Sequence, residues 1–291
     1  MNEEKCYSEE KMAESSMFKR YGEFIYLDGV KTYVVHKGTG ENIILINGIA
    51  ASVYTWRKIL DKLAENFHVF CVDYKGSGFS EKPERGYSID IFTNQILGLM
   101  KHFNLDKAIM AGNSLGGEIA LNLAVKHPDK VSRLILLNSA GYQKGKNITS
   151  YLVKLSRFKL TEKVLEKCMS RRLTKKIAEL ATFNDSIIDK RMVDGYYKPM
   201  KTEGGVRAFT ELVKNLSYTE FDYKKVRSIN IPTLIIWGKE DKVMPVSDAY
   251  KFHKDIKNSK LVILENCGHG PQEEKPDEVV RLINDFAHDR L

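Results

Sequence analysis

Short apolar runs rich in β-branched residues alternate with longer amphipathic stretches along the first half of the chain. Near-continuous apolar runs of this length predict strands of a parallel sheet that are buried on both faces. Asp28-Gly29 separates the first two runs and is a strong signal for a hairpin turn. The predicted strands are residues 23–28, 32–37, 42–47, 68–73, 107–112 and 132–138.

The stretches between these runs have the periodicity of helices that pack on a core. Residues 53–67 place Ile59 and Leu63 on one helical face, and residues 88–103 show the same spacing. A third stretch follows a glycine-rich turn and covers residues 115–127. Strands that alternate with helices predict an α/β fold with a mostly parallel sheet and helices on both faces.

The alternation stops at residues 140–228, which have the pattern of helices and loops with no clear strand. It resumes with strands at 232–238 and 259–265 and with helices at 247–256 and 276–291. We therefore expect a helical segment inserted into one α/β core.

Domain boundaries follow from these patterns. We expect the α/β core to comprise residues 21–139 and 229–291, and the helical subdomain to comprise residues 140–228. Residues 1–20 are polar and acidic, and they read as a frayed or loosely docked leader rather than a secretory signal. No stretch is long and apolar enough to predict a transmembrane helix.

Charge is concentrated in the inserted segment. Residues 140–228 carry 20 Lys and Arg against 10 Asp and Glu. The net positive charge of this segment therefore exceeds the net charge of the whole chain, which is +8. Solvated helix faces are the favoured explanation. Attraction to an anionic substrate or contact with a membrane surface is an alternative that is not favoured. No motif resembles a nucleic-acid-binding module, so we expect no nucleic-acid partner.

Cysteine usage indicates a reducing compartment. The four cysteines are far apart and form no CxxC pair. They are typical of free thiols in a cytoplasmic protein, and no disulfide framework or metal site is expected. We expect no cofactor, and a monomer or homodimer.

A candidate nucleophile lies where a predicted strand meets a predicted helix. Gly112-Asn113-Ser114-Leu115-Gly116 fits the pattern G-x-S-x-G. Glycine at both flanking positions permits a sharp turn that exposes the serine hydroxyl, because a side chain there would collide with the adjacent strand and helix. The N–H of Leu115 is a candidate oxyanion donor.

A serine nucleophile needs a base, and the base needs an orienting carboxylate. His269 follows the last predicted strand, so it lies at the same sheet edge as the serine. Asp241 follows the preceding strand and is the favoured carboxylate, with Glu240 and Glu265 as alternatives. The loop after residues 42–47 offers the second oxyanion donor.

In that loop Gly48 lets the backbone turn inward, and the N–H of Ile49 is the candidate donor. The small apolar residues that follow, including Ala50, suggest an acyl or alkyl group near the oxyanion hole.

Four segments in this order resemble the α/β-hydrolase superfamily, in the cap-bearing serine-hydrolase branch of small bacterial esterases and C–C bond hydrolases. They are DYKGSGFSEKP, GNSLGG, WGKEDKVMP and GHGPQEEKP, and the resemblance extends from about Glu23 to Leu291. It implies a sheet of about eight strands and identifies residues 140–228 with the family's helical cap. The order Ser114, Asp241, His269 is the triad order of the family.

The chain departs from the family at one position. The family usually has His-Gly after the third strand, whereas this chain has Asn47-Gly48. Serine at position 114 argues against epoxide hydrolases and haloalkane dehalogenases, which use an aspartate nucleophile. Glu81 stands where a dinucleotide-binding glycine would be needed, so a dinucleotide site is not expected.

The expected activity is hydrolysis of a carboxylic ester with a small to medium apolar group, through an acyl-enzyme on Ser114. The alternatives are a C–C bond hydrolase of a dienoate-type ring-cleavage product and a low-turnover ligand-binding protein. The expected partner is a small-molecule ester. The candidate pocket residues are Ala50, Phe158, Phe183, Tyr197 and Phe209.

Overall fold

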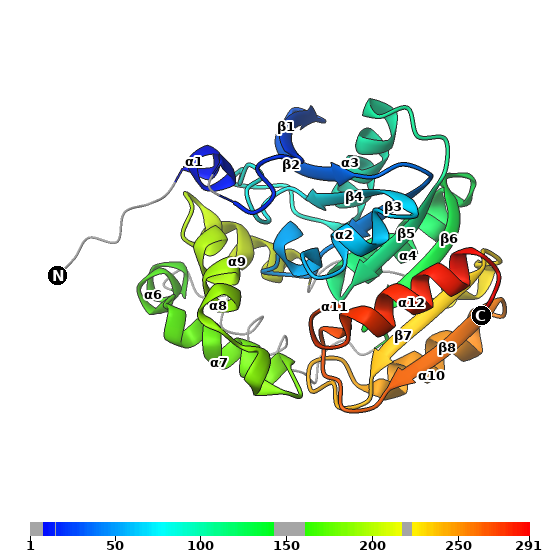
Figure 1. The fold of residues 1–291 in the computed structure, drawn as a ribbon. Helices are drawn as coiled ribbons and strands as arrows, with labels where there is room; N and C mark the ends of the chain where they lie inside the picture. The colour runs from blue at the N-terminus through cyan, green and yellow to red at the C-terminus, as the bar shows by residue number, and fades with distance from the viewer. Residues whose placement is uncertain (1–7, 15, 143–160, 217–222) are drawn as a thin grey trace.

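An eight-stranded sheet forms the centre of the molecule, in the order β1-β2-β4-β3-β5-β6-β7-β8 (Figure 1). The computed structural model describes residues 8–14, 16–142, 161–216 and 223–291. The antiparallel pairs are β1 with β2 and β2 with β4, and the other neighbours are parallel. The strands are β1 (Gly22–Leu27), β2 (Val30–Lys37), β3 (Glu41–Ile46), β4 (Phe67–Asp73), β5 (Ala108–Asn113), β6 (Val131–Leu137), β7 (Thr233–Gly238) and β8 (Ser259–Leu264).

The predicted α/β fold with a mostly parallel sheet of about eight strands is confirmed, and each strand boundary lies within two residues of its expected position. Alternate strand residues point to opposite faces. Ile44 and Phe70 pack on one face with α3, α4 and α10, and Ile43 and Cys71 pack on the other with α2 and α12. The core therefore has two apolar layers, one on each side of the sheet.

Helices and short 3₁₀ turns connect the strands. No helix within the described ranges is long and apolar enough to cross a membrane. The helices are α1 (Glu9–Glu14), α2 (Leu60–Leu63), α3 (Ile89–His102), α4 (Leu115–Lys126), α6 (Thr161–Cys168), α7 (Arg171–Ala181), α8 (Lys190–Met200), α9 (Gly205–Leu216), α10 (Val246–Asp255), α11 (Pro271–Glu274) and α12 (Pro276–Ala287).

Between β6 and β7 the described residues form α6, α7, α8 and α9, here called the α6–α9 segment, and no strand. Figure 1 shows these helices, green to yellow, gathered to one side of the sheet. They share a small core of their own, which contains Met169, Tyr197 and Val206. The segment is thus a separate helical layer on the α/β core.

The leader differs from the expectation of a frayed or loosely docked segment. Within it, α1 buries Met12 and Ala13, and Phe18 beyond it is also buried. Glu9 lies 3.2 Å from the ammonium of Lys82. The sequence did not predict this docking, because three buried side chains among many charged ones do not form a readable helical period.

Candidate active site

Five loops meet at the carboxyl edge of the parallel strands, where ligands bind in open α/β sheets. Each follows a strand directly. They carry Gly48 after β3, Ser114 after β5, Asn138 after β6, Asp241 after β7 and His269 after β8.

Ser114 occupies the sharp turn between β5 and α4. Its backbone has φ 56° and ψ −122°, a conformation that L-residues rarely adopt. A Cβ on Gly112 would lie 2.2 Å from the Gly116 carbonyl oxygen, and a Cβ on Gly116 would lie 2.0 Å from the Ile46 carbonyl oxygen. Neither position therefore accommodates a side chain. This agrees with the explanation, given from the sequence, of why glycine stands at both positions.

His269 and Asp241 form a buried pair. The ring Nδ1 of His269 lies 2.7 Å from Asp241 Oδ2, and the aspartate side chain is fully buried. A carboxylate only accepts hydrogen bonds, so Nδ1 carries the proton and Nε2 of the neutral ring is left with its lone pair. The other oxygen, Asp241 Oδ1, accepts from the backbone N–H groups of Val243 and Met244 at 2.7 and 2.9 Å.

The two alternative carboxylates have other partners. Glu240 accepts from the backbone N–H of Cys267 at 3.0 Å, and Glu265 pairs with Lys239 at 2.8 Å. Among the described residues, Asp241 is thus the carboxylate that contacts the His269 ring.

Asn138 is part of the same network and was not predicted from the sequence. Its Nδ2 donates to Asp241 Oδ2 at 2.6 Å and to the Gly268 carbonyl at 3.2 Å. Its Oδ1 accepts from the Gly238 N–H at 3.1 Å. One side chain thereby connects the ends of β6, β7 and the loop after β8, and its position directly after β6 was the signal that could have identified it.

The loop that carries His269 is held against the serine turn. Asn113, the residue before the serine, donates through Nδ2 to the His269 carbonyl at 3.1 Å and to the Leu137 carbonyl at 3.0 Å. Gln272 donates in turn to Asn113 Oδ1 at 3.2 Å. These bonds bring the predicted nucleophile and base to one place in the fold.

The loop after β3 faces the serine. A Cβ on Gly48 would lie 3.0 Å from Ser114 Cβ, so only glycine allows this approach without displacement. The hydroxyl of Tyr74 donates to the Gly48 carbonyl at 3.0 Å, and Asn47 Nδ2 approaches the same oxygen at 3.4 Å. Burial raises the pKa of Tyr74 far above the usual tyrosine value, which keeps this donor protonated.

A trans peptide directs its carbonyl and its N–H to opposite sides. The Gly48 carbonyl points toward Tyr74, so the following N–H, that of Ile49, points away from it. No acceptor for this N–H is found within the described part of the chain. The N–H of Leu115 also lacks a helical acceptor, because this residue begins α4. Both predicted oxyanion donors are thus available near the serine turn.

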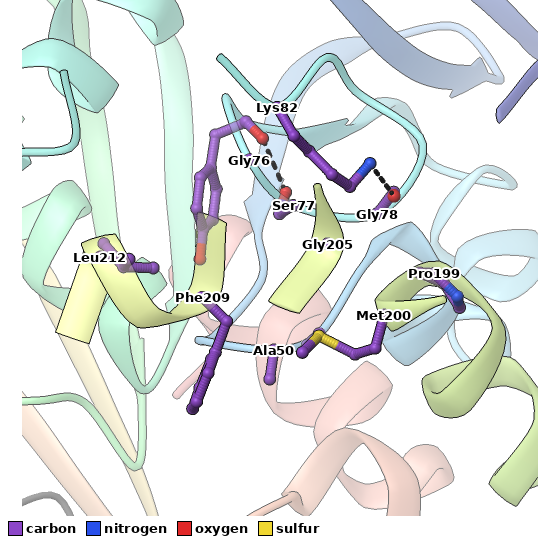
Figure 2. Close-up of a pocket in the computed structure, with 12 residues that line it drawn as sticks. Ala50, Gly76, Ser77, Gly78, Lys82, Pro199, Met200, Gly205, Phe209 and Leu212 are labelled. Atoms are coloured by element: carbon purple, nitrogen blue, oxygen red, sulfur yellow. Dashed lines mark hydrogen bonds between the residues drawn. The ribbon is translucent and has the colours of Figure 1, made fainter. Parts of the chain in front are cut away.

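A pocket lies between the core and the α6–α9 segment (Figure 2). The loop after β3 and the turn after β4 form one wall, and the end of α8 with α9 forms the other. Lys82 also borders it, but its ammonium already donates to the carbonyls of Gly78 and Ser80 at 3.0 and 2.8 Å. The lining is otherwise mainly apolar and includes Ala50, Ala51, Pro199, Met200, Phe209 and Leu212.

The α6–α9 segment contacts the His269 loop directly. The N–H of His269 donates to the Ala181 carbonyl at the end of α7, at 2.7 Å. Glu274 accepts from the Gly268 N–H at 2.8 Å through one oxygen, and through the other from the N–H groups of Phe183 and Asn184 at 2.8 and 3.3 Å. Burial raises the pKa of the Glu274 carboxyl, although these backbone hydrogen bonds oppose the shift.

A second connection involves buried polar groups near the loop after β3. The hydroxyl of Tyr196, on α8, lies 3.0 Å from both Thr55 Oγ1 and Glu273 Oε1. Glu273 also forms an ion pair with Arg57. The helical segment is therefore joined to the core both at the end of α7 and through α8.

A family model described as the alpha/beta hydrolase fold matches residues 41–276, most of the chain. The chain belongs to the α/β-hydrolase fold family. This result confirms the resemblance inferred from the four sequence segments. Together with the hydrolases among its relatives, it identifies the chain as a hydrolase of this fold.

Curated relatives of this α/β hydrolase are similar over nearly their whole length. It is 27% identical over 271 residues to the uncharacterised hydrolase YugF of Bacillus subtilis, covering 89% of this chain and 95% of that protein. It is 28% identical over 289 residues to the 2-hydroxy-6-oxo-6-(2'-aminophenyl)hexa-2,4-dienoic acid hydrolase of Metapseudomonas resinovorans, covering 97% and 96%.

A solved structure is similar to this chain over most of its length. A variant of the meta-cleavage product hydrolase CumD from Pseudomonas fluorescens IP01, complexed with acetates, superposes with a TM-score of 0.81 and 25% identity. The match covers 93% of this α/β hydrolase and 99% of that chain.

The predicted pocket residues divide into three groups. Ala50 and Phe209 are among the residues that line the pocket between the core and the α6–α9 segment. Tyr197 does not, because its ring packs in the small core of the α6–α9 segment beneath the guanidinium of Arg171. Phe183 is 45% exposed and lies on the outside of the segment. Phe158 lies outside the described residues.

Proposed function

We propose that this α/β hydrolase is a serine carboxylesterase in which Ser114, His269 and Asp241 form a catalytic triad and the α6–α9 segment is the cap. The observation that carries the proposal is the 2.7 Å pair between His269 and Asp241 at the sheet edge that also holds the strained serine turn. This arrangement leaves Nε2 of His269 as the free basic nitrogen.

In the first half of the reaction, Ser114 Oγ attacks the ester carbonyl carbon and His269 Nε2 takes the hydroxyl proton. Asp241 holds the ring in the required tautomer and stabilises the imidazolium that forms. The N–H groups of Leu115 and Ile49 stabilise the negative charge on the tetrahedral intermediate. The imidazolium then protonates the leaving alcohol, and an acyl group remains on the serine.

In the second half, His269 deprotonates a water molecule that attacks the acyl carbonyl. The acid leaves and the proton returns to Ser114. The chemistry needs one nucleophile, one base and two N–H donors, and side chains or backbone groups of this chain can provide all of them.

The lining of the pocket supports an ester with an apolar acyl or alkyl group. Ala50 and Phe209 face the space next to the loop after β3. The ammonium of Lys82 is bound to two carbonyl groups and lies 3.2 Å from Glu9, so its charge is already compensated. A neutral chain is therefore a better fit there than an anionic group.

Hydrolysis of a C–C bond is the second candidate, because two of the similar proteins are named as hydrolases of a dienoic acid and of meta-cleavage products. A dienoate carries a carboxylate that needs a positively charged partner. Gly270 follows His269 here, and the loop after β3 reads Asn47-Gly48-Ile49, whereas C–C hydrolases usually have tryptophan and a Gly-Pro sequence at these places. These features favour an ester over a dienoate as the substrate.

The test is a series of p-nitrophenyl esters from acetate to palmitate, together with a dienoate ring-cleavage product. We expect ester hydrolysis with an optimum at short to medium chains. Ser114→Ala should lower kcat/KM by at least about 10⁴-fold. Turnover of the dienoate without turnover of any ester would contradict the esterase proposal and would support a C–C bond hydrolase. Binding without turnover, unchanged in Ser114→Ala, would instead support a ligand-binding protein.

A further inference from the structure

Exposed apolar side chains are concentrated on one helix of the α6–α9 segment. Ile177 and Leu180, on α7, are 53% and 48% exposed, and Phe183 just beyond the helix is 45% exposed. Residues three and four apart share a helical face, so the half-buried Leu173 extends this stripe along α7. Large apolar groups that gather in this way mark an interaction surface.

Positive charge flanks the stripe. Arg172 and Lys176 are four residues apart, and both are exposed. Neither forms an ion pair with another residue in the described ranges, whereas Lys175 is paired with Glu179 at 3.7 Å. A short amphipathic helix with leucine or isoleucine on one side and unpaired cations beside it has the features of a helix that lies in a membrane interface.

The stripe also leads to the candidate site. Ala181, directly after Leu180, accepts the hydrogen bond from the N–H of His269. Phe183 donates its N–H to Glu274, which also holds the His269 loop. Figure 1 shows α7 at the outer edge of the segment, on the side away from α1. A surface that contacted α7 would thus lie next to the loop that carries the proposed base.

We propose that the face of α7 formed by Leu173, Ile177 and Leu180, with the flanking Arg172 and Lys176, docks the protein on an anionic lipid surface. Apolar side chains enter the headgroup region, and the cations contact the lipid phosphates. A second copy of the chain is a poorer occupant because it brings the same positive charge. The consequence for substrate class, an ester delivered from a lipid layer, rests on the proposed function.

The first experiment measures sedimentation of the whole chain with vesicles. One set is phosphatidylcholine alone, and the other contains about one quarter phosphatidylglycerol. We expect binding to the anionic vesicles at least about tenfold stronger than to the neutral ones, and weakened by salt. Equal binding to both sets of vesicles contradicts the proposal, and so does a failure to bind either set. Failure to bind either set would favour an acidic protein as the occupant of this face.

Variants test whether vesicle binding depends on the apolar stripe of α7 or is nonspecific adsorption. The double variant Ile177→Glu, Leu180→Glu should lose most vesicle binding, and Arg172→Gln with Lys176→Gln should lose the preference for anionic lipid. Ile91→Glu, which changes a 37% exposed residue on α3, is the matched control and should bind as the unchanged chain does. Normal binding by the Ile177, Leu180 variant overturns the proposal.

Hydrolysis of a short soluble ester is measured on the same samples. It should be unchanged in every one of these variants, which shows that the fold is intact. Absence of ester hydrolysis in the unchanged chain would count against the proposed function alone, because the vesicle result is read independently of turnover.

Discussion

The two halves of the candidate site are built differently. At the sheet edge, Asp241 receives four hydrogen bonds, and Asn138 joins three separate loops. The α6–α9 segment contributes apolar walls and reaches the site through a few connections, among them Ala181 with His269 and Phe183 with Glu274.

The difference separates two tasks. Groups that transfer protons must be held within a few tenths of an ångström, and dense hydrogen bonding between consecutive strand ends provides this. Walls that select a substrate need shape and apolar surface, which a helical layer with its own small core can change independently of the chemistry. We expect substitutions at the sheet edge to alter the rate. Substitutions of the segment's pocket-lining residues should alter which substrates are accepted.

The largest effect is expected at the sheet edge, for Asp241→Asn. An amide can donate toward Nδ1 and thereby favour the wrong tautomer of His269, so kcat/KM should fall by about 10⁴-fold. Steady-state hydrolysis of a short ester measures this. Glu265→Gln is the matched control, because Glu265 pairs with the exposed Lys239, and it should stay within about twofold of the unchanged chain. Equal losses in both variants would contradict the assignment of Asp241.

An intermediate effect is expected at the junction of the two halves, for Glu274→Gln. The carboxylate accepts from Gly268 through one oxygen and from Phe183 and Asn184 through the other. Glutamine has one acceptor oxygen, so a buried N–H is left facing an amide NH₂ group.

We expect kcat in Glu274→Gln to fall by about tenfold with little change in KM, because the His269 loop loses a positioning contact. Glu278→Gln, at a half-exposed position on α12, is the control and should change neither parameter. A change confined to KM would assign Glu274 to the substrate walls rather than to the proposed base.

The smallest effect on activity is expected for Asp73→Asn, because Asp73 is a buried residue at the end of β4 and does not line the pocket. Asp73 accepts from the N–H groups of Val53 and Phe79 at 2.7 and 2.9 Å, and burial raises its pKa to about 6. The folded state therefore holds the proton more tightly than the unfolded state between about pH 4 and pH 6. The contribution to stability falls as pH rises through that window, by on the order of 3 kcal/mol.

Urea unfolding at both ends of this pH window checks the prediction. The free energy of unfolding of the unchanged chain, relative to Asp73→Asn, should decrease as the pH rises. A difference that is independent of pH would show that the carboxyl of Asp73 does not titrate in this range.

Residues next to strand ends were the most predictable from sequence. Ser114, Asp241 and His269 each lie in the loop or turn that follows an apolar run, and parallel strands bring their carboxyl ends to one edge. Asn138 obeys the same rule after β6, but an amide is neither a nucleophile nor a base, so its place in the sequence did not predict a role for it. Its role depends on which groups surround it, and only the structure supplies those.

Residues of the helical segment were the least predictable. Phe183 and Tyr197 are both aromatic, yet one is exposed and the other is buried away from the pocket. A helical period identifies which residues share a face, but it does not say which neighbour that face contacts. The docking of α1 through Met12 and Ala13 was not predicted either, because so few apolar side chains among many charged ones form no readable period.

The central claim is that Ser114 carries the acyl group during turnover, and trapping that group tests it most directly. The chain is mixed with a slowly hydrolysed p-nitrophenyl ester, quenched with acid, digested and analysed by mass spectrometry. We expect an acyl adduct on the peptide that contains Ser114, absent from Ser114→Ala and formed far more slowly in His269→Gln. An adduct on another residue, or rapid ester hydrolysis by Ser114→Ala, would contradict it.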